Sequence, residues 1–121
     1  MPHKAIHWRA GTRIRDDRYG TVFELISKAS GARGIGIAYV EVDPGKESPA
    51  HFHEATEEVY CFVEGTGVMT VDTDTFDVGP GDVVYLPLRS VHSIRNTSAV
   101  PLCFISADAP PYDPEDDTEV Q

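Results

Sequence analysis

GKESPAHFHEATEEVYCFVEG, residues 45–65, is the stretch of this sequence that decides the fold. It holds two histidines separated by one residue, a polar bend, and then an apolar run that ends at a glycine. Residues two apart on an extended chain point to the same face, so His51 and His53 can approach one point. Glu58 begins the following apolar run, and Tyr60 and Phe62 share its face because the strand period is two.

Short apolar runs of this kind recur along the chain with turn signals between them. Helical periodicity is nearly absent. Many short strands at this spacing indicate an all-β sandwich or closed barrel. The predicted strands are 21–27, 34–42, 57–64, 68–72, 75–78, 83–86, 92–96 and 102–106.

A second stretch, GDVVYLPLRSVHSIRN at residues 81–96, brings in His92 after a Pro-containing turn. His92 opens a strand and can close the site from the opposite side. Three imidazoles and one carboxylate suit a divalent transition metal, namely manganese, iron, nickel, cobalt, copper or zinc, better than calcium or magnesium. A single H-x-H pair is weak support for a metal site, so the prediction depends on the combination.

The two stretches resemble the paired motifs of the cupin superfamily, G-x5-H-x-H-x4-E-x6-G and G-x5-P-x-G-x2-H-x3-N. Nine of the ten fixed positions match, in order. The resemblance implies a single jelly-roll (double-stranded β-helix) cupin barrel with one metal ion held by His51, His53, Glu58 and His92. It also implies tight turns with positive φ at Gly45, Gly65 and Gly81.

Two positions in these motifs allow more than one interpretation. Glu57 could replace Glu58 as a ligand in a looser form of the motif, but counting back from Gly65 favours Glu58. Arg89 stands where the family usually has glycine, so we expect that turn to differ slightly. Arg89 is then either a solvent-facing turn residue, which we favour, or a group at the site entrance that attracts an anionic substrate.

Residues that share a face with the ligands should line a pocket. The candidates are Tyr60, Phe62, Ile94, Tyr39 and Phe104. They can equally be ordinary core residues of the barrel, and the sequence singles out no catalytic residue. A mainly apolar lining suits a small organic molecule that chelates the metal. We expect a metal-dependent enzyme, either a dioxygenase (an oxidoreductase) or an isomerase or lyase, with a non-catalytic binding or sensing cupin as the alternative.

The chain of 121 residues, with 40% hydrophobic residues, fits one domain. We expect a barrel with an N-terminal extension strand over residues 1–109, that strand pairing within the chain or on a partner subunit. Residues 110–121 form an acidic, Pro-rich tail with too little apolar content to order alone.

Charge and composition restrict the partners. The formal net charge of −10 disfavours nucleic acid. No apolar run is long enough to span a membrane, and the N-terminus shows no signal-peptide pattern, so the cytoplasm is the expected location. Cys61 and Cys103 are expected as reduced sheet residues, and His3 and His7 as exposed residues rather than a second metal site. An exposed strand edge needs covering, so a homodimer is expected.

Overall fold

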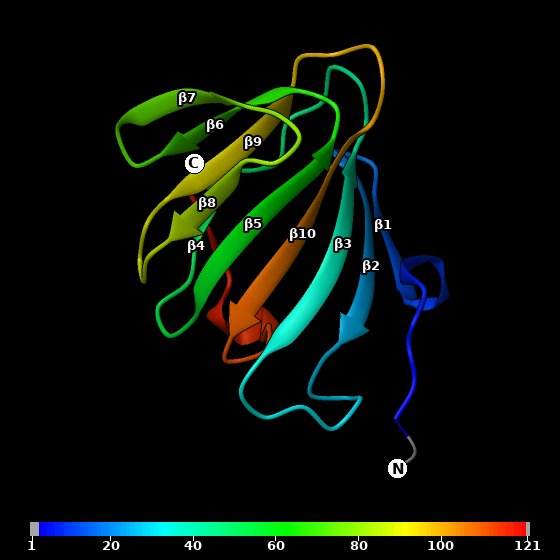
Figure 1. Cartoon of the computed structure of the whole chain (residues 1–121). Coiled ribbons are helices and arrows are strands. Elements are labelled where there is room, and N and C mark those ends of the chain that lie inside the picture. The colour runs from blue at the N-terminus through cyan, green and yellow to red at the C-terminus, as the bar shows by residue number, and fades with distance from the viewer. Residues whose placement is uncertain (1–2, 121) are drawn as a thin grey trace.

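The computed structural model describes residues 3–120, and these consist mainly of antiparallel strands (Figure 1). No helix among them is long or apolar enough to cross a membrane. The elements are η1 (Trp8–Ala10), β1 (Thr12–Asp16), β2 (Gly20–Ile26), β3 (Gly36–Val42), β4 (His51–Phe52), β5 (Glu57–Glu64), β6 (Gly67–Val71), β7 (Asp74–Val78), β8 (Val83–Leu86), β9 (His92–Asn96), β10 (Leu102–Ala109), η2 (Pro114–Asp116) and β11 (Thr118–Glu119).

The strands form two sheets (Figure 1). The six-stranded sheet has the order β1-β2-β3-β10-β5-β8, and the five-stranded sheet has the order β11-β4-β9-β6-β7. After β3 the chain passes repeatedly from one sheet to the other, which is the course of a jelly roll. The jelly-roll barrel expected from the sequence is therefore confirmed.

The core lies between the two sheets because each strand turns alternate side chains inward. Glu58, Tyr60 and Phe62 on β5 are all buried, whereas Glu57 and Val63 on the same strand are exposed. The core cluster consists of Val40, Val42, Tyr60, Phe62, Met69, Val78, Val84, Leu86, Ile94, Leu102 and Phe104. One end of this cluster borders the polar site that is described below.

The turns that bracket the two motifs have the backbone conformation expected of them. Gly45, Gly65 and Gly81 have φ values of 73°, 80° and 91°. At Gly65 a Cβ atom would lie 2.6 Å from the carbonyl oxygen of Pro101, so the close approach of two chain segments also requires glycine.

Arg89 has a φ of 65°, so the expectation that its turn differs from a glycine turn is wrong. The left-handed conformation costs a non-glycine residue about 1–2 kcal/mol. The backbone N–H of Arg89 donates to the carbonyl oxygen of His53 at 2.8 Å, and its Nε donates to Glu54 at 3.0 Å. These bonds hold the Arg89 turn against the bend that follows His53.

The N-terminal strand pairs within the chain. β1 runs antiparallel to β2, with Thr12 opposite Glu24 and Asp16 opposite Gly20, and it forms one edge of the six-stranded sheet. Before β1, the indole of Trp8 stacks on Tyr39 with ring centroids 4.0 Å apart. The N-terminal segment thus covers the outer face of the six-stranded sheet.

The C-terminal tail is ordered against the barrel rather than alone. β11 pairs with β4, placing Thr118 opposite Phe52 and Glu119 opposite His51. The backbone N–H of Val120 also donates to the carbonyl oxygen of Ala50 at 2.8 Å. The tail has few apolar residues, and backbone hydrogen bonds to β4, the strand that carries His51, hold it in place.

Candidate metal centre

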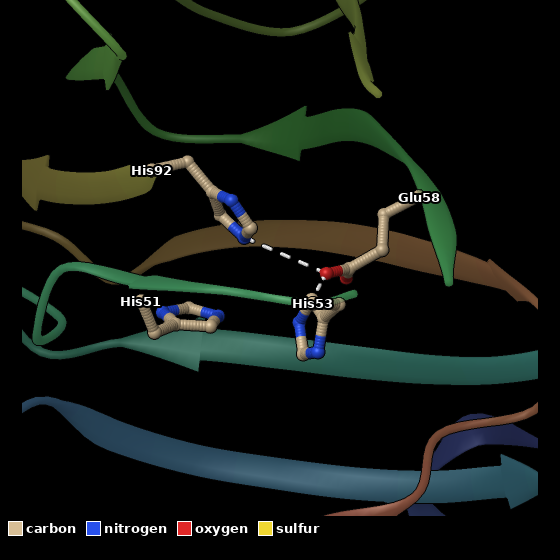
Figure 2. Close-up of side chains that lie close together, drawn as sticks. All are labelled: His51, His53, Glu58 and His92. Atoms are coloured by element: carbon tan, nitrogen blue, oxygen red, sulfur yellow. Dashed lines mark ion pairs between the residues drawn. The ribbon is translucent and has the colours of Figure 1, made fainter. Parts of the chain in front are cut away.

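The four predicted ligands come from both sheets (Figure 2). His51 lies on β4 and pairs directly with His92 on β9, so the register of the five-stranded sheet brings these two imidazoles together. His53 follows β4, and Glu58 projects from β5 of the opposite sheet. One ligand atom of each residue lies within 4.8 Å of every other, so the structure brings all four side chains to a common centre.

Backbone carbonyl oxygens fix the orientation of each imidazole. Nδ1 of His51 lies 2.9 Å from the carbonyl oxygen of Pro49, Nδ1 of His53 lies 3.0 Å from that of Asp116, and Nδ1 of His92 lies 3.0 Å from that of Ser90. A carbonyl only accepts, so each Nδ1 must carry the proton. Each Nε2 is therefore left for the centre, as in metal-ligating histidines.

The centre contains polar atoms that the described residues leave unpartnered. Oε1 of Glu58 and Nε2 of His92 are buried and make no hydrogen bond within residues 3–120, although they lie 3.5 Å apart. Nε2 of His53 approaches the same Oε1 to 2.6 Å. A buried carboxylate that faces three imidazole Nε2 atoms is costly unless a proton or a metal cation lies between them. The donor set thus fits a divalent transition metal.

The histidines and the glutamate of the centre shift one another's pKa values. Burial disfavours the protonated form of His53, but its contact with Glu58 and the charge of that carboxylate outweigh burial and raise the pKa of His53 to about 9. Burial opposes ionisation of Glu58, yet the neighbouring His53 and His92 hold its pKa well below the usual range. Burial and the charge of His92 lower the pKa of His51. Without metal, the centre keeps an ionised Glu58 beside a protonated His53.

Glu57, the alternative ligand, points away from the centre. It is exposed on the outer face of β5 and accepts a hydrogen bond from the hydroxyl of Tyr85. Glu58 is 6% exposed and belongs to the cluster. The strand period of two places adjacent glutamates on opposite faces, so only one of them can reach the metal.

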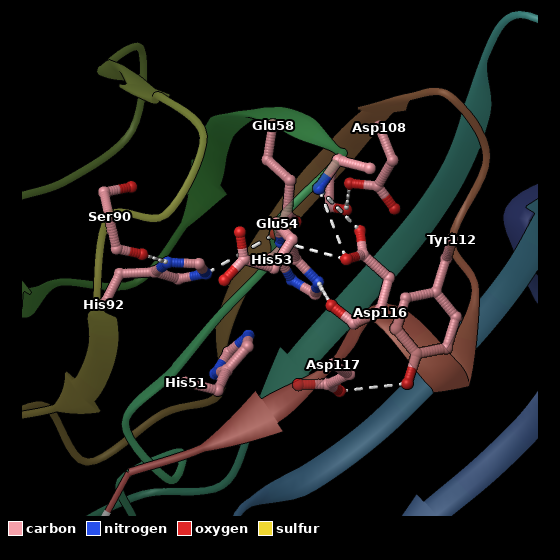
Figure 3. A network of polar contacts seen from close by, with 12 residues as sticks. His51, His53, Glu54, Glu58, Ser90, His92, Asp108, Tyr112, Asp116 and Asp117 are labelled. Atoms are coloured by element: carbon pink, nitrogen blue, oxygen red, sulfur yellow. Dashed lines mark hydrogen bonds and ion pairs between the residues drawn. The ribbon is translucent and has the colours of Figure 1, made fainter.

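Sequence reasoning missed the contribution of the tail to this centre (Figure 3). Besides accepting from His53 through its backbone, Asp116 accepts hydrogen bonds from the backbone N–H groups of Glu54 and Ala55 at 2.9 and 3.1 Å. The bend after His53 is therefore fixed by a residue 63 positions away in the sequence. No local signal in the acidic tail could have shown this contact.

Asp108 was also missed. Its carboxyl is buried on β10, directly opposite Glu58 in the register of the sheet, and accepts from the hydroxyl of Ser106 at 3.2 Å. Burial and the charge of Glu58 raise the pKa of Asp108 to about 8. Without metal, Asp108 therefore keeps its proton to a higher pH than an ordinary aspartate does.

A cavity of about 440 Å³ opens next to the centre, and His51 and Glu58 form part of its wall. Of the predicted pocket residues, Tyr60, Ile94 and Phe104 line it. Phe62 does not; it lies deeper in the core, against Phe104. Tyr39 does not either, because alternation on β3 turns Val40 inward and Tyr39 outward onto Trp8.

The remaining sequence candidates lie away from the centre. Arg89 is paired with Glu54 and its side chain is 70% exposed, which matches the favoured solvent-facing interpretation. His3 and His7 are exposed and belong to no potential metal cluster among residues 3–120. Cys61 and Cys103 are free thiols, as expected.

Fold and site together define a class: a small jelly-roll protein whose barrel holds a three-histidine, one-carboxylate metal centre. Comparison with known families agrees. A model described as the cupin domain matches residues 38–108, and the chain belongs to the cupin family.

Individual proteins and solved structures are also similar to this chain. An uncharacterized protein of Methanocaldococcus jannaschii is 39% identical over 110 residues, which cover 91% of this chain and 82% of that protein. Oxalate decarboxylase of Bacillus subtilis is 33% identical over 79 residues, which cover 61% of this chain and 20% of the enzyme. A solved structure of that enzyme, described with Mn(II) centres, superposes with a TM-score of 0.78 at 27% identity, covering 93% of this chain and 31% of the other. This chain spans only a fraction of that enzyme's length.

Replacing Glu58 by glutamine should remove most bound metal, because the neutral amide no longer balances the charge of the ion. We expect a loss of affinity of at least about 100-fold, beyond the roughly 10–100-fold typical of losing a residue that only supports a ligand. Metal content after dialysis measures this. The matched control is Glu57→Gln, which should retain metal; the opposite order would show that the wrong glutamate has been assigned.

Replacing Asp116 by alanine should weaken metal binding by about tenfold, because the bend that carries His53 loses its two side-chain acceptors. The dissociation rate of Mn²⁺ into excess chelator is the measurement. Glu115→Ala is the control, since Glu115 lies on the same short helix and its side chain is exposed. Equal dissociation rates for both variants would contradict a role of the tail in holding His53.

Metal affinity should rise with pH. The metal requires neutral His53, whose raised pKa of about 9 keeps it protonated at neutral pH in the metal-free protein. Binding at pH 7 must therefore release about one proton from this residue, and affinity should increase about tenfold per pH unit until the pH approaches that pKa. Calorimetry of Mn²⁺ binding between pH 6.5 and 8.5, in buffers of different ionisation enthalpy, counts the proton. An affinity independent of pH over this range would contradict the charge state derived for His53.

Proposed function

We propose that this cupin is a metal-dependent enzyme that acts on a small organic molecule in the cavity beside His51, His53, Glu58 and His92. The observation that carries the proposal is the position of the ligand cluster on the cavity wall. A purely structural ion would be enclosed by protein, whereas His51 and Glu58 border open space of about 440 Å³. A molecule in that space can reach the ion directly.

Manganese is the ion we propose first. The donor set suits several divalent transition metals. The related oxalate decarboxylase of Bacillus subtilis is described with Mn(II) centres. The likeness covers nearly all of this chain, which supports a similar ion here.

When bound, the metal would polarise an oxygen of the ligand molecule or, if redox-active, support oxidation. The residues of the chain would hold the ion and shape the cavity. Tyr60, Ile94 and Phe104 form an apolar floor that limits water, and burial raises the pKa of Tyr60 so that its phenol stays neutral. Lyase or isomerase chemistry and dioxygenase chemistry both fit this arrangement; a non-catalytic binding or sensing protein is the second candidate.

We also propose a homodimer. β8 is an outer strand of the six-stranded sheet, and Val83 and Tyr85 on it are 65% and 56% exposed. An exposed apolar edge invites pairing with another strand. Light scattering at micromolar concentration should give twice the chain mass of 13.3 kDa, and the chain mass itself would contradict the dimer.

The test begins with elemental analysis of natively purified protein, where we expect one divalent transition metal per chain. The manganese form is then assayed without oxygen, and the iron form by oxygen uptake, on small diketones, phenols and sugar acids. Turnover that the Glu58→Gln variant loses would support an enzyme. Binding of these compounds without turnover in either form would favour the binding protein, and absence of stoichiometric metal would refute the proposal.

A further inference from the structure

An apolar row of side chains crosses the inner face of the six-stranded sheet. The registers of the sheet place its members opposite one another on β1, β2, β3, β10 and β5 in turn, and they are Ile14, Val22, Val40, Phe104 and Phe62. Side chains paired in this way share one face of the sheet and lie next to each other. All but Phe62 line the cavity beside the metal centre. The row therefore leads along the cavity wall from the barrel core to the first strand.

Exposure rises along this row. Phe62 and Phe104 are each 2% exposed, and Val40 is 8% exposed. Val22 is only partly buried, and Ile14 is 48% exposed. β1 and β2 lie on the side of the molecule away from β6 and β7 (Figure 1), and β11, at the edge of the five-stranded sheet opposite to β7, has only two residues. The outer members of the row thus face the cavity instead of a second sheet, although they point into the barrel.

Small side chains separate this row from the metal centre. The next row of the inner face consists, from β5 to β2, of Tyr60, Ser106, Ala38 and Glu24. Ser106 and Ala38 both line the cavity and fill little of the width between Tyr60 and Glu24. Glu58 lies in the row beyond Tyr60, because the strand period is two. Open space therefore runs from the metal ligand Glu58 over Ala38 to the half-buried Val22.

The size and shape of this space indicate a small molecule as its occupant. A water molecule takes about 30 Å³ of liquid volume, so the space has room for roughly 15 non-hydrogen atoms. The cavity volume of about 440 Å³ is thus larger than a compound that only chelates the metal would need. A second protein would need about 800 Å² of surface on this side. Of the five residues in the apolar row only Ile14 is classed as exposed, which offers far too little surface.

We propose that the cavity takes a molecule with two parts, a chelating oxygen group on the metal and an apolar chain or ring that lies over Ala38 against Val40 and Val22. This inference rests on the function proposed above and narrows its substrate class. The apolar part would cover Val22 and Ile14, which the second sheet leaves open, and burial of its carbon atoms would add affinity in proportion to their number. Ala38 and Val22 are then residues that determine specificity.

A series of alkyl hydroxamates tests this inference, because the chelating group stays constant while the chain grows. Acetohydroxamate, butyrohydroxamate, hexanohydroxamate and octanohydroxamate are titrated into the manganese-loaded full chain by calorimetry. We expect affinity to rise by up to about fourfold for each added methylene, and by at least about tenfold from acetohydroxamate to hexanohydroxamate. 6-Hydroxyhexanohydroxamate is the matched compound, and its terminal hydroxyl group should remove much of the gain.

Ala38→Leu should abolish the gain with chain length, because the larger side chain fills the space that the alkyl chain needs. Ala107→Leu is the matched control, since Ala107 lies on the neighbouring strand β10 and does not line this cavity. It should keep the gain of the unmodified protein. Metal content and circular dichroism show whether each variant is folded.

Val22→Thr keeps the shape of the side chain and replaces a methyl group by a hydroxyl group. It should weaken binding of hexanohydroxamate by about threefold or more, while Val63→Thr, on the exposed face of β5, should not. This variant decides the location of the apolar part if Ala38→Leu does not fold.

The outcomes separate the two proposals. Equal affinities across the series, or a gain with chain length that neither Ala38→Leu nor Val22→Thr reduces, would overturn the apolar subsite while leaving the metal site intact. If no hydroxamate binds the metal-loaded protein, an accessible metal is absent. The proposed function then fails and this inference fails with it.

Discussion

The burial of the Glu58 carboxylate is the constraint on which the rest of the structure depends. An isolated buried charge is strongly destabilising, and a pair of buried charges is stable only when its geometry is held firmly. In the metal-free protein, Glu58 is balanced by a proton on His53, 2.6 Å away. A divalent ion would replace that proton and satisfy His92 and Glu58 together. Folding and metal binding are therefore linked through one acidic side chain.

The jelly roll meets this constraint because it supplies ligands from two sheets. The register that places His51 opposite His92 fixes one side of the centre, and β5 of the other sheet delivers Glu58. The hydrogen bond from each Nδ1 to a backbone carbonyl then orients the rings. None of the three carbonyls belongs to a strand, so the loops and the tail do as much to orient the ligands as the strands do. This explains why an acidic tail of low apolar content is ordered here.

The sequence predicts the barrel, most strands and the four ligands, because strand alternation and motif spacing are local signals. It does not predict which face of β3 points inward. Both faces of that strand carry apolar residues, Tyr39 on one and Val40 on the other, so periodicity cannot decide between them. Nor does it predict Asp108 or Asp116, whose roles come from pairing across the sheet and from contacts between distant segments. The left-handed Arg89 was missed because a hydrogen bond to His53 supports a conformation that its residue type disfavours.

The region that this chain shares with its family contains the local sequence motifs. Part of the cavity wall comes from segments outside that region. The residues that hold the metal lie within the matched region, residues 38–108. Four of the six carboxyl groups on the cavity wall, those of Asp16, Glu24, Asp117 and Glu119, lie outside that region. Cupins with the same four ligands can therefore differ in the molecules they accept without any change to the metal centre. In this protein, the first strands and the tail supply much of the cavity wall, whereas the shared motif supplies the metal-binding cluster.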